Sequence, residues 1–306
     1  MSIDAIGLTK RYGEVTAVDD LSFSVEPGRV TGFLGPNGSG KSTTMRMILG
    51  VDLPTSGQAR VDGQRYEELQ YPGRVVGALI EARAVDPRRS ARNHLRMLAA
   101  CARISDARVD EVIELVGLSS AANRKVGGFS LGMHQRLGVA AALLGDPEYL
   151  LLDEPTNGLD PEGIRWMREF FRHLADEGRG LLVSSHLLSE LQLYVDHLVV
   201  IAAGRLLRDV SVQDFVDDVT DSHVRVVTPT PDQLTRLLSA RELGVVPDGD
   251  GLRVTGVSAA IVGDIAAANS IVLHELTPVH ESLEDAFLRE TAGKGQYRSG
   301  GKGATS

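Results

Sequence analysis

Short apolar runs separated by helical patterns dominate the first two thirds of the chain. Three of these runs lie at residues 30–34, 149–152 and 180–185, and each one ends in polar, chemically capable residues. Continuous apolar strands of this length are typical of a parallel sheet with helices on both faces. The pattern therefore predicts an α/β fold with a mixed, largely parallel sheet.

Two regions depart from this alternation. Residues 90–103, 106–117 and 131–145 have helical spacing and are rich in Ala and Leu, which predicts a helical subdomain at about 86–146. Residues 3–26 are β-rich, with turn signals at Tyr12-Gly13 and Pro27-Gly28, and predict a β region near the N-terminus.

A second, smaller domain is predicted after residue 210, beyond a linker at 211–222. Its expected elements are a strand at 224–228, a helix at 231–241, a hairpin of 244–246 with 252–254, a helix at 259–268 and a strand at 271–276. The order βαββαβ predicts a ferredoxin-like α+β accessory domain at 223–292. A last helix is expected at 281–291, and the Gly-, Ser- and Lys-rich residues 293–306 predict a disordered tail.

Composition agrees with this outline. The 306 residues suit two domains, with one unusually large domain as the alternative, and 42% hydrophobic residues allow a real core. The net charge of −9 argues against a nucleic-acid surface. No signal-peptide pattern begins the chain, and no apolar run approaches the ~18–20 residues of a membrane span. A membrane role would thus need a separate membrane partner.

The single cysteine, Cys101, excludes an internal disulfide and suits a reducing compartment. It lies in the apolar stretch 98–102, so we expect buried packing rather than catalysis.

The polar residues after the first apolar run form the most specific motif. Residues 35–43 fit Gly-x-x-x-x-Gly-Lys-[Ser/Thr], the phosphate-binding loop of nucleoside triphosphatases. Its members are Gly35, Pro36, Asn37, Gly38, Ser39, Gly40, Lys41, Ser42 and Thr43. The glycines let successive N–H groups form an anion nest, Lys41 can reach the β- and γ-phosphates, and Ser42 can ligate Mg²⁺. A helix at 42–49 would point its N-terminus at the phosphates, whereas a chance Gly-rich turn is the alternative.

The other two runs end in candidate catalytic groups. Asp153 and Glu154 follow 149–152, and His186 follows 180–185. Ligands of such sheets collect beyond the carboxyl ends of the strands, so these groups and Lys41 are expected at one edge. Asp153 can hold Mg²⁺, usually through water, while Glu154 can orient or deprotonate an attacking water.

Residues 129–136, Phe-Ser-Leu-Gly-Met-His-Gln-Arg, complete a resemblance to the ATP-binding subunits of ABC transporters, which covers roughly residues 3–210. They resemble the family's signature loop, commonly Leu-Ser-Gly-Gly-Gln. Phe129, Leu131 and Met133 depart from it, while Ser130 and Gly132 are kept. Ser130 can cap a helix, so the following N–H groups would make a second anion site. In the family that site closes on the γ-phosphate held by the other subunit.

The resemblance implies further roles. Tyr12 matches the aromatic residue that stacks on adenine, His186 the histidine that contacts the γ-phosphate, and Asp160 ends the loop 157–160 that communicates across the dimer. It also implies ATP and Mg²⁺ as cofactors and a homodimer or heterodimer of ATP-binding subunits. These would bind separate membrane permease subunits, so the chain would be cytoplasmic and peripheral on the inner face of the membrane.

Glu81 is the clearest departure, since most family members have Gln there. Gln can coordinate Mg²⁺ through its carbonyl, and Glu still offers oxygen ligands; a solvent-facing strand cap is the alternative. Residues 77–81 and 282–288 resemble the drug- and antibiotic-exporting branch, which implies an efflux ATPase. A soluble ABC-type ATPase acting on ribosomes or DNA, or an importer ATPase, remains the alternative.

Overall fold

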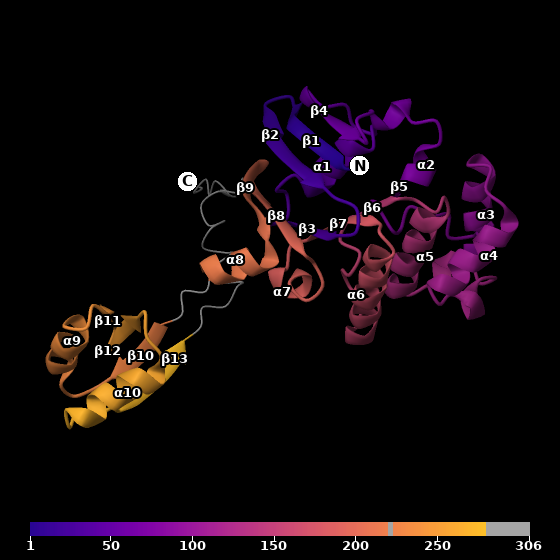
Figure 1. Cartoon of the computed structure of the whole chain (residues 1–306). Helices are drawn as coiled ribbons and strands as arrows, with labels where there is room; N and C mark the ends of the chain where they lie inside the picture. Colours follow the sequence, from indigo (N-terminus) through magenta and orange to yellow (C-terminus); the bar gives the residue numbers. More distant parts are fainter. Residues whose placement is uncertain (220–222, 280–306) are drawn as a thin grey trace, which may run out of the picture. The chain divides into compact units, whose positions relative to one another are not determined.

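The computed structural model describes residues 1–219 and 223–279. They fall into two compact units, divided along the chain between Val212 and Gln213. Figure 1 labels the elements of both units, and we describe each unit by itself.

The first unit is built on a six-stranded sheet with the strand order β5-β6-β7-β3-β8-β9. Its strands are β3 (Val30–Leu34), β5 (Val76–Leu79), β6 (Tyr149–Leu152), β7 (Gly180–Ser185), β8 (His197–Ala202) and β9 (Arg205–Ser211). All neighbours are parallel except β8 and β9. Every residue of β3, β6 and β7 is buried, which explains their continuous apolar sequences. The predicted largely parallel sheet is confirmed.

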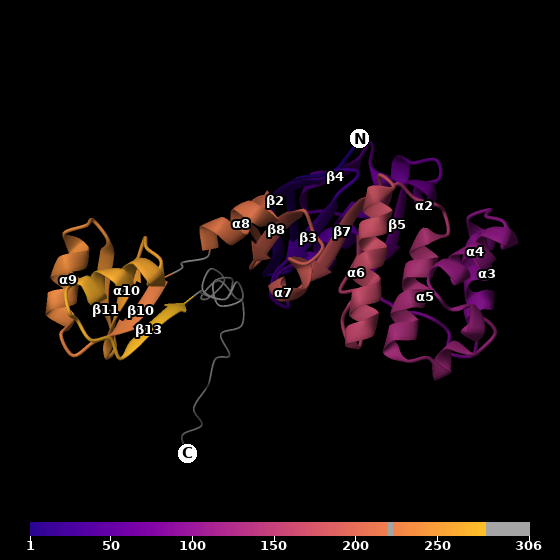
Figure 2. The same cartoon turned by 60° about the horizontal axis from the view of Figure 1, so that its bottom comes forward.

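A smaller antiparallel sheet is formed by β1 (Ile3–Tyr12), β2 (Val15–Val25) and β4 (Ser56–Val61). One apolar core joins it to the large sheet and to α1 (Lys41–Ile48). Figure 2 shows the small sheet, labelled at β2 and β4, lying against the large sheet. Phe33 of the large sheet and Phe23 of the small sheet meet in this core, with ring centroids 5.2 Å apart. Met45 and Ile48 of α1 are buried in the same cluster. This packing fixes where the loop between β3 and α1 lies.

The helical subdomain contains α3 (Ala91–Cys101), α4 (Asp106–Leu115) and α5 (Leu131–Leu143), in agreement with the predicted helices. Ser90, Ser105 and Ser130 cap them by accepting backbone N–H groups of the first turn. The other helical segments of the first unit are 3₁₀ turns Tyr66–Glu68, Ser119–Ala121 and Val126–Gly128, and helices α2 (Pro72–Val75), α6 (Pro161–Asp176) and α7 (Leu188–Leu191).

The expectation for Cys101 is wrong, because its side chain is exposed. The buried side of α3 carries Ala91, His94, Leu95 and Ala99. Cys101 lies two residues after Ala99, which at 100° per residue turns it towards solvent.

The boundary between the units falls within α8 (Val212–Val219), so the predicted linker contains a helix. The sheet of the second unit has the antiparallel order β11-β12-β10-β13. The elements are β10 (His223–Val227), α9 (Pro231–Ser239), β11 (Gly244–Asp248), β12 (Gly251–Thr255), α10 (Ala259–Ala268) and β13 (Glu275–Val279). The order βαββαβ is the predicted one, and the ferredoxin-like assignment stays a prediction that this order supports.

The strand predicted at 271–276 is wrong, because the last described strand begins at Glu275. Ile271 and Leu273 pack in the core of this unit without pairing in the sheet, so their apolar pattern reports burial alone. The helix predicted at 281–291 and the tail at 293–306 lie outside the described residues. Within the described ranges, no helix is long and apolar enough to cross a membrane.

Candidate active site

The loop between β3 and α1 requires its glycines. Gly38 and Gly40 have φ angles of 80° and 107°, in the left-handed region that favours glycine. A Cβ at Gly40 would lie 2.6 Å from the carbonyl oxygen of Ala17, and one at Gly35 would lie 2.5 Å from Ser39 Oγ. The backbone therefore curls tightly ahead of α1, as an anion nest requires.

Lys41 is the first residue of α1, and its side chain extends back to the loop that precedes the helix. Its ammonium group donates to the carbonyl oxygen of Gly35 at 2.6 Å and lies 3.4 Å from Glu154 Oε1. The side chain is only 6% exposed. Burial lowers the pKa of Lys41, and the negative charges of Glu154 and Asp153 oppose that shift.

The carboxyl ends of β6 and β7 bring the other candidates to the same place. Glu154 follows β6 by two residues and His186 follows β7 directly. His186 Nδ1 lies 2.9 Å from Glu154 Oε2, while Glu154 Oε1 faces Lys41. Lys41, Glu154 and His186 thus form one connected group at the sheet edge.

Ser184, a residue that the sequence analysis did not single out, organises this edge. Its hydroxyl donates to Asp153 Oδ1 at 2.6 Å and accepts the backbone N–H of Glu154 at 2.8 Å. The side chain is fully buried in β7. The available signal was a hydroxyl inside an otherwise apolar strand, where a buried polar group needs a specific partner.

The candidate signature loop lies at the start of α5. Ser130 Oγ accepts the N–H of Met133 at 3.3 Å, which is the predicted helix cap. Leu131 packs over Gly158, where a Cβ would be 2.1 Å from Leu131 Cδ2. Asp160 caps α6 by accepting the N–H of Gly163 at 2.9 Å. The loop 157–160 therefore packs on the signature loop of its own chain.

Comparison with known proteins decides the family. A family model described as ABC transporter matches residues 18–157, and a model described as a domain of unknown function (DUF8746) matches residues 222–284. The chain is 37% identical to the uncharacterized ABC transporter ATP-binding protein YhcH of Bacillus subtilis, over 93% of this chain and 94% of that protein. It is 34% identical to the bacitracin transport ATP-binding protein BcrA of Enterococcus faecalis, over 96% and 97% of the two chains.

The chain belongs to the ATP-binding subunits of ABC transporters. Among solved structures, an ATP-binding subunit of an ABC transporter superposes with a TM-score of 0.65 at 26% identity, over 71% of this chain and 93% of that one. The predicted family, the cassette fold and the ATPase class are therefore confirmed.

In this ABC ATPase, Tyr12 is half-exposed and anchored beside α1. Its phenol donates to Asp52 Oδ2 at 2.8 Å and also interacts with Thr43 of the phosphate loop. Burial, followed by Asp52, raises the pKa of Tyr12. The Lys10 ammonium lies 4.9 Å from the ring centroid, in a cation–π contact with one face of the ring.

Glu81 is exposed beyond the end of β5. The backbone N–H of Asp153 bonds the carbonyl oxygen of Leu79 at 2.7 Å, so the end of β5 adjoins the site. Among the residues that the structure describes, the Glu81 carboxylate has no ion-pair or hydrogen-bond partner, and it is not drawn into the group around Lys41.

The donor set fits Mg²⁺ better than a transition metal. In residues 1–219 and 223–279, no three His, Cys, Asp or Glu side chains cluster as metal ligands. Mg²⁺ needs no such cage, because it is usually held by one or two protein oxygens together with phosphate oxygens and water. Ser42 and Asp153 offer oxygens of that kind.

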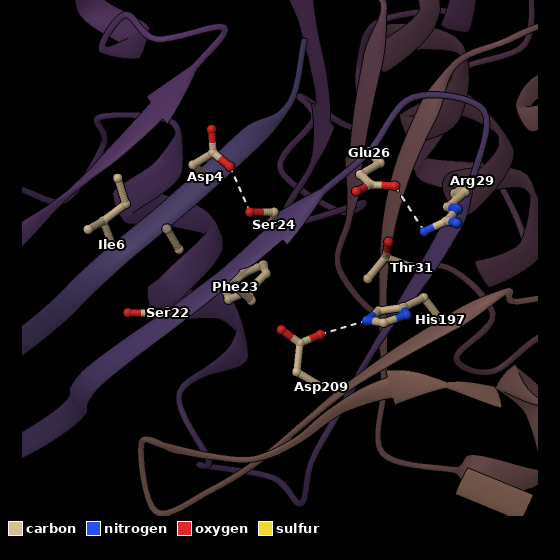
Figure 3. Close-up of a pocket in the computed structure, with 11 residues that line it drawn as sticks. Asp4, Ile6, Ser22, Phe23, Ser24, Glu26, Arg29, Thr31, His197 and Asp209 are labelled. Atoms are coloured by element: carbon tan, nitrogen blue, oxygen red, sulfur yellow. Dashed lines mark hydrogen bonds and ion pairs between the residues drawn. The ribbon is translucent and has the colours of Figure 1, made fainter. Parts of the chain in front are cut away.

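A separate hollow of about 530 Å³ lies between the two sheets, away from this group (Figure 3). Its charged side chains pair with their neighbours: Arg29 with Glu26 at 2.9 Å, and His197 with Asp209 at 2.6 Å. Asp4 accepts the hydroxyl hydrogen of Ser24 at 2.7 Å. The sheet edge therefore remains the candidate site.

Proposed function

We propose that this ABC ATPase hydrolyses ATP at the Lys41–Glu154–His186 group to power export of a drug, an antibiotic or a similar compound. The observation that carries the proposal is that group: an ammonium on a phosphate loop, 3.4 Å from a carboxylate whose other oxygen lies 2.9 Å from a histidine. The bacitracin transport protein that matches nearly the whole chain supports the exporter branch.

The phosphate loop and Lys41 would bind the β- and γ-phosphates of ATP. The bonds of Lys41 to loop carbonyls would be exchanged for bonds to phosphate oxygens, which are stronger partners for an ammonium group because they are charged. Ser42 and Asp153 would hold Mg²⁺, which when bound would neutralise phosphate charge.

Glu154 would act as the base towards the attacking water. Its Oε1 atom faces the Lys41 ammonium at 3.4 Å, and it would be free to accept a water proton once that ammonium turns to the phosphates. His186, hydrogen-bonded to Oε2, would hold the carboxylate in place and contact the γ-phosphate.

A second ATP-binding subunit would complete the site, in a homodimer or heterodimer. Ser130 and Gly132 of one chain would close on the γ-phosphate bound by the other, and Asp160 would belong to the loop that communicates across the dimer. Tyr12 would stack on adenine through its exposed ring. Closure with ATP and release after hydrolysis would drive membrane permease subunits, placing the chain at the inner face of the membrane.

Glu81 and the following residues to Arg92 would form the surface that couples the site to the permease. Glu81 is exposed two residues after Leu79, and the hydrogen bond between Leu79 and Asp153 supports a link from Glu81 to the site. Its carboxylate oxygen would approach Mg²⁺ only when the site closes.

The Glu154→Gln variant tests the catalytic assignment. We expect it to bind ATP with near wild-type affinity and to hydrolyse it ~10²–10⁴-fold more slowly, because the amide cannot accept the water proton. Equilibrium ATP titration and single-turnover hydrolysis measure the two quantities. Near-normal turnover in this variant would overturn the proposal for Glu154.

Export is tested on the chain co-purified with its permease in lipid vesicles. ATP-driven movement of a peptide antibiotic out of the compartment that contains the ATPase is the expected result. Uptake that requires a solute-binding protein would indicate an importer instead.

A further inference from the structure

The main chain of Glu154 is strained and held from two sides. Its φ angle is +48°, in the left-handed region that a non-glycine residue keeps only when surrounding contacts fix it. Its N–H donates to Ser184 Oγ of β7 at 2.8 Å. Its carbonyl oxygen accepts the N–H of Asn157 at 3.1 Å and the side-chain amide of Gln135 at 3.3 Å.

Ser184 fixes both acidic residues with one hydroxyl. The hydroxyl hydrogen is donated to Asp153 Oδ1, and an oxygen lone pair accepts the N–H of Glu154. The Ser184 hydroxyl is thus both a donor and an acceptor. Because the side chain is fully buried, solvent water does not substitute for either bond.

Gln135 is a buried amide from a different element, the signature helix α5. A carbonyl oxygen only accepts, so the amide nitrogen must be the atom that faces Glu154. The other amide atom, Oε1, is buried and has no hydrogen-bond partner within 1–219 and 223–279. A buried, unpaired acceptor lowers stability, so folding stability alone does not account for Gln at this position.

We propose that Ser184 and Gln135 are positioning residues that hold the Glu154 main chain so that its carboxylate stays between Lys41 and His186. This inference rests on the role of Glu154 proposed above. Neither side chain would touch ATP, so their loss would slow hydrolysis and leave ATP binding almost unchanged. A shift of the carboxylate by about 1 Å is enough to cost ~100-fold in rate.

The test uses the full-length chain with Ser184→Ala, or with Gln135→Met, which keeps the side-chain length and removes the amide. We expect kcat to fall ~10–100-fold in each while ATP affinity, measured without Mg²⁺ because Ser184 also holds Asp153, changes less than ~3-fold. Gln135→Met should unfold at the wild-type temperature or above it, because it removes the unpaired buried acceptor. If Gln135 had only a structural role, Gln135→Met would instead lose stability together with activity.

Ser24→Ala is the matched control, since Ser24 also donates to an aspartate at 2.7 Å but lies in β2, away from the site. It should keep wild-type kcat. If Ser184→Ala does not fold, Gln135→Met carries the test alone.

Combination with Glu154→Gln separates this inference from the proposed function. If Ser184 and Gln135 act through Glu154, adding either change to Glu154→Gln lowers the residual rate no further. Wild-type kcat in both single variants, or full additivity with Glu154→Gln, would overturn the inference. Normal turnover of Glu154→Gln itself would instead refute the role of Glu154.

Discussion

At the scale of residues, the buried polar groups of the cassette differ in whether they have partners. Ser184 satisfies two neighbours, whereas His94 in α3 is buried with no partner for Nδ1 among the described residues. Burial, helped by the charge of Arg89, lowers the pKa of His94 below its ordinary value of 6.5. Folding therefore disfavours protonation of His94.

This shift predicts a pH dependence of stability. The unfolded chain binds a proton at His94 more readily than the folded chain, so the free energy of unfolding should decrease as the pH falls below about 6.5. The decrease between pH 7.5 and pH 5.5, measured by urea unfolding, should be smaller in His94→Leu. Equal decreases in the two proteins would show that His94 does not contribute.

At the scale of elements, the sequence predicted the buried strands best. β3, β6 and β7 are buried on both faces, so their continuous apolar sequences indicated both burial and strand pairing. Ile271 is buried although it lies outside the sheet, so its apolar character did not indicate a strand. The phosphate loop, Asp153, Glu154 and His186 were predictable because a motif or a strand end marks each one.

Contacts that depend on tertiary structure were not predictable. Ser184 and Gln135 reach Glu154 from β7 and α5, and neither spacing nor composition brings these three residues together. The fit of Leu131 over Gly158 is of the same kind. Leu131, one of the residues that depart from the usual signature sequence, therefore lies against the loop that follows Glu154.

Gly158→Ala tests that fit. Its φ angle is 73°, and a Cβ would collide with Leu131, so we expect a loss of about 1–3 kcal/mol in the free energy of unfolding. Gly63→Ala is the control, because Gly63 has a φ angle of 81° with open space around it. The excess loss at Gly158 should disappear when Leu131→Ala is added. An equal loss at both glycines would leave only backbone strain as the cause.

At the scale of the molecule, one chain carries both halves of the proposed site but in different places. Lys41, Glu154 and His186 gather at the sheet edge, while Ser130 lies at the start of α5 and is bonded to Met133. In the proposed dimer, each ATP takes the first group from one chain and Ser130 from the other. The second unit has its own core of residues such as Val226 and Leu234.

Mixing two inactive chains tests this shared site most directly. A Glu154→Gln chain keeps Ser130, and a Ser130→Arg chain keeps Glu154, so a mixed dimer holds one intact site although neither homodimer does. We expect ATP hydrolysis to return when the two proteins are combined and to stay at the low residual level of each variant alone. No activity in a mixture whose mixed dimers are confirmed, for example by differential tagging and pull-down, would contradict it.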